Sequence, residues 1–130
     1  MTDHLLRALT VRQPWASLIV TGRKNVENRS WNTRYRGPLV IHAGLGIDKD
    51  GLTAHKSLLP DEVPHGCVLG VVDLLNVVRD SKSAWAEPGM YHWVLANPRA
   101  LSRPLEASGK LGLWTPSPTL VHELQGEGVA

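Results

Sequence analysis

The sequence predicts an α+β fold in which five or six short strands form a small β-barrel flanked by two or three short helices. Its 130 residues are 42% hydrophobic and 20% charged, which is typical of a globular chain with the length of one domain. Short apolar runs rich in β-forming residues recur along the chain, and short helical patterns lie among the early ones. This mixture favours a closed or nearly closed barrel with helices on its flank.

The expected strands follow the apolar runs. They cover residues 8–11, 23–29, 38–43, 67–78 and 91–95, with one or two further short strands in 101–114. The continuous apolar run in residues 38–43 indicates a strand buried on both faces, and Gly44 and Gly46 are expected to end it. In the expected strand over residues 23–29, the side chain of Val26 should point into the core.

The first helix has clear signals at both ends. Pro14 suits a first helical position, where its missing N–H costs nothing. An apolar stripe begins at Trp15, and Gly22 supplies a left-handed stop, so a helix over 14–21 is predicted. Two more short helices are expected over 48–58, where Gly51 is unfavourable, and over 119–124. Residues 125–130 are expected to be a frayed tail.

A modest net charge of +2 hides an uneven distribution. Residues 1–36 hold seven basic and two acidic residues, a net charge of +5, and the rest of the chain carries −3. Trp15, Trp31 and Tyr35 lie inside this basic segment. Cations interleaved with aromatic rings are what single-stranded nucleic acid binding requires. The alternative is a solvated charged face over ordinary core aromatics, which is the commoner outcome for surface charge.

Cysteine and hydropathy patterns exclude several classes of protein. The single cysteine, Cys67, cannot form an intrachain disulfide or a structural zinc site, and its place at the start of a buried strand predicts an inert core thiol. No apolar run approaches the roughly 20 residues of a membrane span, and the N-terminus lacks a signal-peptide pattern. We therefore expect a cytoplasmic protein with no metal, no cofactor and no membrane contact.

The segment after Gly22 has the spacing of a binding site. In an extended segment Glu27 and Arg29 project on the same face, so the Glu27 carboxylate can hold Arg29 or Lys24 in a fixed pose. Lys24 is expected to lie in the turn and bend back. A cation held in this way can receive a phosphate or a carbonyl oxygen. A surface cluster contributing under about 1 kcal/mol is the alternative.

This segment resembles the G-x-K-x-x-E-x-R signature of ASCH domains, which belong to the PUA-like β-barrel superfamily. Gly22, Lys24, Glu27 and Arg29 stand at its four positions. Residues 9–16 (LTVRQPWA), 36–43 (RGPLVIHA) and 112–114 (GLW) also resemble motifs of the ASCH subgroup that begins with R-Q-P-W. The resemblance is specific in the first 45 residues and loose between 46 and 110. It implies a cleft beside residues 22–29, which PUA-like domains generally use to bind RNA or modified nucleotides.

The resemblance and the order of residues together suggest which side chains line this cleft. The candidate nucleic-acid-binding residues are Arg12, Gln13, Trp15, Lys24, Glu27, Arg29, Tyr35 and His42. Gln13 could read a base edge through its amide, and Trp15 or Tyr35 could stack on a base. Burial in the core is the alternative for Trp15 and for His42.

Three functions stay open at this point, and the first two concern RNA or a modified nucleotide. The first is a binding module. The second is a metal-independent hydrolase, a ribonuclease or an acetylcytidine-type amidohydrolase, in which Lys24 acts with Glu27 or Asp73. Some bacterial ASCH proteins that this chain resembles remove the acetyl group from acetylated cytidine with a lysine, a threonine and an acid. Glu27 stands in the threonine's place, which argues against that mechanism. A protein–protein adaptor anchored by tryptophans is a third possibility.

Overall fold

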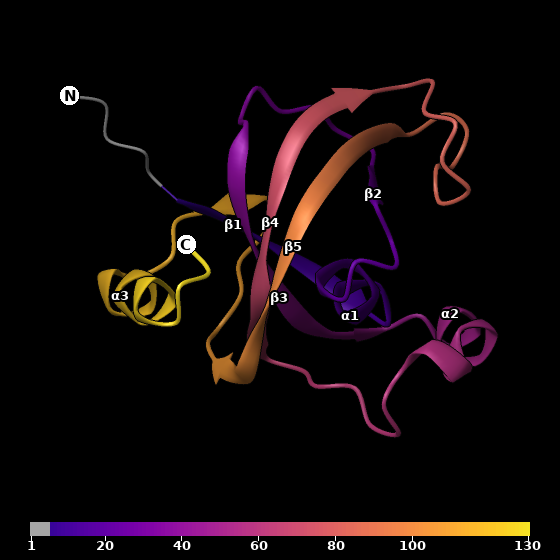
Figure 1. Ribbon diagram of the computed structural model, residues 1–130. Helices are drawn as coiled ribbons and strands as arrows, with labels where there is room; N and C mark the ends of the chain where they lie inside the picture. The colour runs from indigo at the N-terminus through magenta and orange to yellow at the C-terminus, as the bar shows by residue number, and fades with distance from the viewer. Residues whose placement is uncertain (1–5) are drawn as a thin grey trace.

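Six strands in the order β2-β5-β4-β3-β1-β6 form one curled sheet in the computed structural model, which describes residues 6–130 (Figure 1). The strands are β1 (Arg7–Gln13), β2 (Val26–Arg29), β3 (Gly37–Ile47), β4 (Cys67–Val78), β5 (Tyr91–Glu106) and β6 (Leu113–Trp114), and the helices are α1 (Trp15–Val20), α2 (Lys49–Ala54) and α3 (Pro118–Gly126), with a 3-10 turn over Lys56–Leu58. The N-terminal residues that bear on a signal peptide lie outside this described range.

The sheet is a half-barrel with β2 and β6 at its two edges. β1 pairs with β3 in parallel, and all other neighbours are antiparallel. The parallel pair requires a crossover, and α1 and β2 lie in the segment between its two strands. The expected α+β class, the number of strands and the short helices are confirmed.

Two hydrophobic cores lie on opposite faces of the sheet. The first includes residues of α1 together with Leu39 and Ile41 of β3, and the second includes Val40 of the same strand together with Leu120 and Leu124 of α3. Successive residues of a strand face opposite sides of a sheet. Leu39 and Ile41 therefore pack in the first core and Val40 in the second, and all three are 0% exposed. Figure 1 shows α1 and α3 on opposite sides of the sheet. The prediction that this strand is buried on both faces is confirmed.

The turn after α1 directs the chain toward β2. Gly22 has a φ of +81°, the left-handed conformation that glycine adopts without steric cost. Its N–H donates to the Ile19 carbonyl at 3.0 Å, and the Arg23 N–H donates to the Leu18 carbonyl at 3.0 Å, which is a Schellman ending. The Lys24 N–H also donates to the Leu18 carbonyl, at 2.9 Å. This reversal places Lys24 two residues before the start of β2.

Two strands are longer than the sequence predicts. β3 continues through Gly44 and Gly46 to Ile47, which pairs with Gln13 of β1. Glycine fits there because a Cβ on Gly44 would lie 2.9 Å from Cγ2 of Thr10. β5 runs without a break from Tyr91 to Glu106, because register shifts in its pairing with β4 accommodate the irregular stretch around residues 97–98.

The C-terminal tail is packed against the sheet, contrary to expectation. α3 extends to Gly126, and Val129 is 8% exposed in the second core. Arg99 Nε donates to the Val129 carbonyl at 2.9 Å, and the Val129 N–H donates to the Leu124 carbonyl at 3.2 Å. The prediction of a frayed tail is wrong because apolar burial and these hydrogen bonds hold the chain.

Candidate functional site

A pocket of about 740 Å³ opens beside β2. Side chains from β1, the start of α1, β2, the α2 region and the loop between β4 and β5 line it. The candidates Arg12, Trp15, Lys24, Glu27 and Arg29 all belong to this lining. The structure therefore brings five of the predicted residues to one open site.

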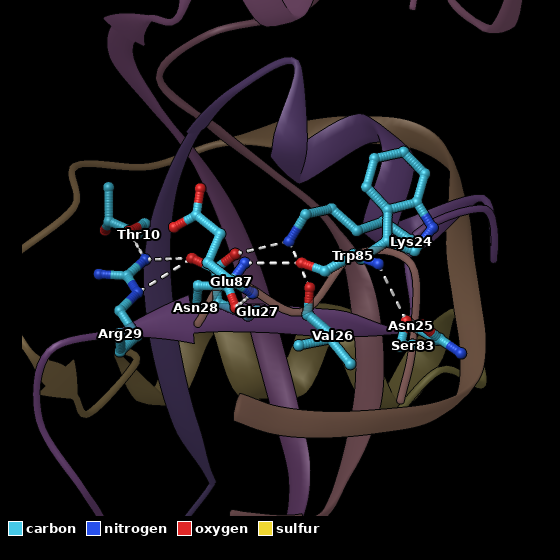
Figure 2. A network of polar contacts seen from close by, with 10 residues as sticks. All are labelled: Thr10, Lys24, Asn25, Val26, Glu27, Asn28, Arg29, Ser83, Trp85 and Glu87. Carbon is cyan, nitrogen blue, oxygen red and sulfur yellow. Dashed lines mark hydrogen bonds and ion pairs between the residues drawn. The ribbon is translucent and has the colours of Figure 1, made fainter. Parts of the chain in front are cut away.

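Glu27 joins two cations on one wall of the pocket (Figure 2). Lys24 Nζ lies 3.1 Å from Glu27 Oε1, and Arg29 Nη2 lies 2.8 Å from Glu27 Oε2. Lys24 Nζ also donates to the Val26 carbonyl, and Arg29 Nη2 donates to the Thr10 carbonyl at 3.0 Å. Lys24 is 5% exposed and Glu27 7%, so the lysine bends back as the spacing predicts. We call Lys24, Glu27 and Arg29 the charged triad.

Three rings form a second wall, which we call the aromatic wall: Trp15, His55 and Trp85. The His55 and Trp85 ring centroids are 5.0 Å apart, and Trp15 meets both edge-on, at 5.7 Å from His55 and 6.4 Å from Trp85. Lys24 Nζ lies 5.8 Å from the Trp15 ring centroid, so the aromatic wall and the charged triad adjoin. All three rings are partly exposed, as a stacking surface requires.

Asparagines near the triad hold the loop that carries Trp85. Asn28 Nδ2 donates to the Trp85 carbonyl at 2.8 Å, and the Glu87 N–H donates to Asn28 Oδ1 at 2.9 Å. Ser83 Oγ donates to Asn25 Oδ1 at 2.7 Å. Figure 2 shows these contacts running to the loop from Asn28 of β2 and from Asn25, the residue before β2. The asparagines between the signature residues therefore help to fix the loop that carries Trp85 of the aromatic wall.

His55 and Trp85 were not among the predicted site residues. Both come from segments without a recognised motif, one just after α2 and the other in the polar connection before β5. A single tryptophan in a polar loop is an ordinary feature of a protein surface, so the sequence carried no specific signal for either residue. Their meeting with Trp15 depends on the tertiary fold.

Formal charges in the pocket balance, which differs from the expected basic cleft. Among residues 6–130, the lining holds three basic and three acidic side chains: Arg12, Lys24, Arg29, Glu27, Asp48 and Glu87. The other basic residues of the first 36 do not line it. The +5 of that segment is therefore spread over the surface rather than gathered in the pocket.

Gln13 and His42 lie in the interior instead of the pocket. Gln13 is 0% exposed, and its amide nitrogen donates to the Pro64 carbonyl and to the Ser17 hydroxyl, both at 2.8 Å. It therefore has no free edge with which to read a base. His42 is 2% exposed, with Nε2 2.6 Å from the Ala107 carbonyl oxygen. The alternative of a core histidine fits this environment.

Tyr35 and Asp73 also lie outside the pocket lining. The Tyr35 hydroxyl donates to the Pro38 carbonyl, and burial raises the pKa of its phenol above 10. Asp73 forms an ion pair with Arg99 at 3.0 Å and accepts a hydrogen bond from Asn97 at 3.1 Å. Its carboxylate is thus engaged away from Lys24, and the structure does not bring it to the site as a catalytic acid.

Neither a metal cluster nor a membrane helix is found in the part of the chain that the structure describes. No group of three or more His, Cys, Asp or Glu side chains there is arranged to hold a metal ion. None of its helices has the length and apolar character needed to cross a bilayer.

The curled half-barrel defines the class of this protein. Its fold matches the solved ASCH structure from Zymomonas mobilis with a TM-score of 0.62 and 14% identity, over 95% of this chain and 96% of that one. A Tyr-to-Phe variant of the same protein matches equally, over 95% and 98% of the two chains. The ASCH domain family model matches residues 9–105, and the chain belongs to this family.

Two mammalian relatives share part of this sequence. Activating signal cointegrator 1 of Homo sapiens is 44% identical over 79 residues, and that of Mus musculus is 44% identical over 80 residues. Each match covers 52% of this chain but 14% of the relative. The likeness therefore concerns one segment of much longer proteins.

Proposed function

We propose that this ASCH domain binds a nucleotide of RNA, or a modified nucleotide, in the pocket between the aromatic wall and the charged triad. One observation carries the proposal: a stacking surface of three rings adjoins polar groups that are already fixed in place. Nucleotides combine a flat ring with polar edges and a phosphate, and this pocket offers a counterpart to each.

The aromatic wall supplies sequence-tolerant affinity. Stacking of a base on an aromatic side chain contributes about 1–3 kcal/mol. Trp85 and Trp15 are partly exposed within the lining, so a ring can reach them without unfolding the core. The loop that carries Trp85 is held by hydrogen bonds to Asn28, which lowers the entropy cost of ordering it on binding.

The charged triad supplies polar recognition. Lys24 Nζ donates to the Val26 carbonyl and to Glu27 Oε1, and the third N–H of its ammonium can donate to a base edge. Arg29 is fixed by Glu27 and by the Thr10 carbonyl, so little order is lost when it contacts a ligand. Arg12 is exposed and forms no ion pair among residues 6–130, which leaves it available for a phosphate.

The test is a titration followed by NMR on the tryptophan indole N–H signals. The ligands are cytidine 5′-monophosphate, acetylated cytidine and a single-stranded hexaribonucleotide. We expect shifts at Trp15 and Trp85, and a 5- to 150-fold weaker affinity in Trp85→Leu, which corresponds to the loss of about 1–3 kcal/mol of stacking. Leu111→Ala, at a 98% exposed residue outside the lining, is the control. Absence of binding by all three ligands at millimolar concentration would refute the proposal.

Hydrolysis is the alternative chemistry at the same site, and the geometry favours it less. A general base must accept a proton from water, yet both carboxylate oxygens of Glu27 already accept from cations. Asp73 lies outside the lining. Incubation with acetylated cytidine and with single-stranded RNA in EDTA distinguishes the two functions. Turnover that is lost in Lys24→Met would favour the hydrolase, whereas binding without turnover favours the module.

A further inference from the structure

We infer that a second nucleotide subsite lies beside the pocket, at Arg79 and Tyr91, and that it takes the neighbouring nucleotide of a single-stranded RNA. This inference rests on the proposed function. It extends the site from one nucleotide to two, and it assigns the second to residues outside the signature of the family.

The subsite adjoins the pocket on the same face of the sheet. Tyr91 pairs directly with Arg29 across β2 and β5. Directly opposed residues of an antiparallel pair project on the same side, with Cβ atoms about 4.5–5.5 Å apart. Met90, which precedes Tyr91, lines the pocket. A chain that leaves the pocket past Arg29 therefore meets Tyr91 next.

Arg79 is already in position over that ring. Its guanidinium carbon lies 4.4 Å from the Tyr91 ring centroid, within the range of a cation–π contact. Its Nη2 donates to the Gly89 carbonyl at 3.0 Å. The guanidinium is held from two sides, so little side-chain entropy is lost when it contacts an anion.

The charge of Arg79 lacks an acidic partner, unlike the cations of the triad. Lys24 and Arg29 share the carboxylate of Glu27. Among residues 6–130 no ion pair includes Arg79, which is exposed. A planar guanidinium with open N–H groups matches a phosphate. The pocket, whose formal charges balance, would thus hold the base, and Arg79 would supply the attraction to the phosphate backbone of the RNA.

A comparison of ligand lengths tests the subsite. Cytidine 5′-monophosphate and hexacytidylate are titrated into the wild-type chain and into Arg79→Ala, at several salt concentrations. We expect Arg79→Ala to weaken the binding of hexacytidylate about five- to tenfold and to leave the affinity for the monophosphate unchanged. The slope of log K against log salt for hexacytidylate should fall in magnitude by about 0.7, the value of one phosphate contact on a single strand. Arg103→Ala removes the same charge from an exposed site outside the lining, farther along β5, and should change neither affinity.

The outcomes separate this inference from the proposed function. Binding of the monophosphate together with equal hexacytidylate affinity in Arg79→Ala and Arg103→Ala would overturn the subsite and leave the pocket intact. An equal loss for both ligands in Arg79→Ala would also overturn it, because Arg79 would then belong to the pocket. Competition by hexaglutamate as strong as that by hexacytidylate would show a general anion site. Failure of both nucleotide ligands and of acetylated cytidine to bind the wild-type chain would instead refute the proposed function.

Discussion

The indole of Trp15 lies where a side chain on Gly51 would have to be. A Cβ on Gly51 would approach Cζ2 of Trp15 to 2.5 Å, closer than carbon atoms pack. This contact seats α2 against the aromatic wall, and it explains a glycine inside a helix where alanine would be favoured by about 1 kcal/mol. Gly51 is therefore part of the support for the pocket.

Replacement of this glycine should damage the pocket more than the fold. In Gly51→Ala, we expect the Trp15 indole to move, and cytidine 5′-monophosphate to bind at least about fivefold more weakly, since roughly 1 kcal/mol of stacking would be lost. The position of the Trp15 indole signal by NMR and the affinity measure this. Gly126→Ala is the matched control, because a Cβ there meets nothing within 4 Å. Unchanged binding in Gly51→Ala would show that α2 does not support the wall.

Glu27 should matter for stability as well as for binding. Glu27→Gln leaves the buried Lys24 ammonium without its counter-charge, and such a loss costs about 3 kcal/mol. The denaturant midpoint should fall while the m-value stays constant. Asp73→Asn removes the charge of a partly exposed pair, in which the side chain of Asp73 is 28% exposed and that of Arg99 is 23% exposed, and should cost under about 1 kcal/mol. Equal costs for the two variants would contradict a buried role for the triad.

Local signals in the sequence predicted the region around the triad well. The stop at Gly22 depends on one backbone conformation, and the shared face of Glu27 and Arg29 depends on strand alternation, which neighbouring residues determine. Val26 points into the core and is 1% exposed, as the same alternation requires. Such features need no knowledge of distant contacts.

The roles of other residues depended on partners far along the chain. The Gln13 amide is engaged by the Pro64 carbonyl, 51 residues away, and His42 by the Ala107 carbonyl, 65 residues away. Gln13 shares a motif with Arg12 and Trp15 of the pocket, and His42 lies in another motif of the family resemblance, yet these contacts make both residues structural. Spacing cannot distinguish a polar group that faces a ligand from one that faces a carbonyl across the core.

The composition of the aromatic wall could not be predicted for the same reason. Trp15 was a candidate because it lies in the basic segment and in the motif at the entry of the first helix, but its neighbours His55 and Trp85 lie 40 and 70 residues further along the sequence. The charge of the pocket likewise depends on Asp48 and Glu87, which come from the later part of the chain. A charge count along the sequence therefore overestimated how basic the site is.

Alkaline pH should destabilise the fold in part through Tyr35. Burial raises the pKa of its phenol above the value of 10 for an exposed tyrosine. The unfolded chain therefore releases this proton at a lower pH than the folded chain, so the contribution to stability is complete below pH 10 and is lost as pH rises through the folded pKa. We expect the free energy of unfolding to fall less steeply above pH 10 in Tyr35→Phe than in the wild type. Parallel curves from pH 8 to 11.5 would refute this.

The single thiol should be unreactive in the folded chain. Burial raises the pKa of the Cys67 thiol above 9.0, with a further contribution from the charge of Glu106, so less of it is thiolate at pH 8 than of an exposed cysteine. The side chain is also 7% exposed, which limits access by a reagent. Labelling by a disulfide reagent at pH 8 should therefore be slow in the native protein and fast in denaturant. Ser108→Cys adds an exposed thiol as an internal reference, and equal native labelling rates at the two positions would show that the start of β4 opens readily.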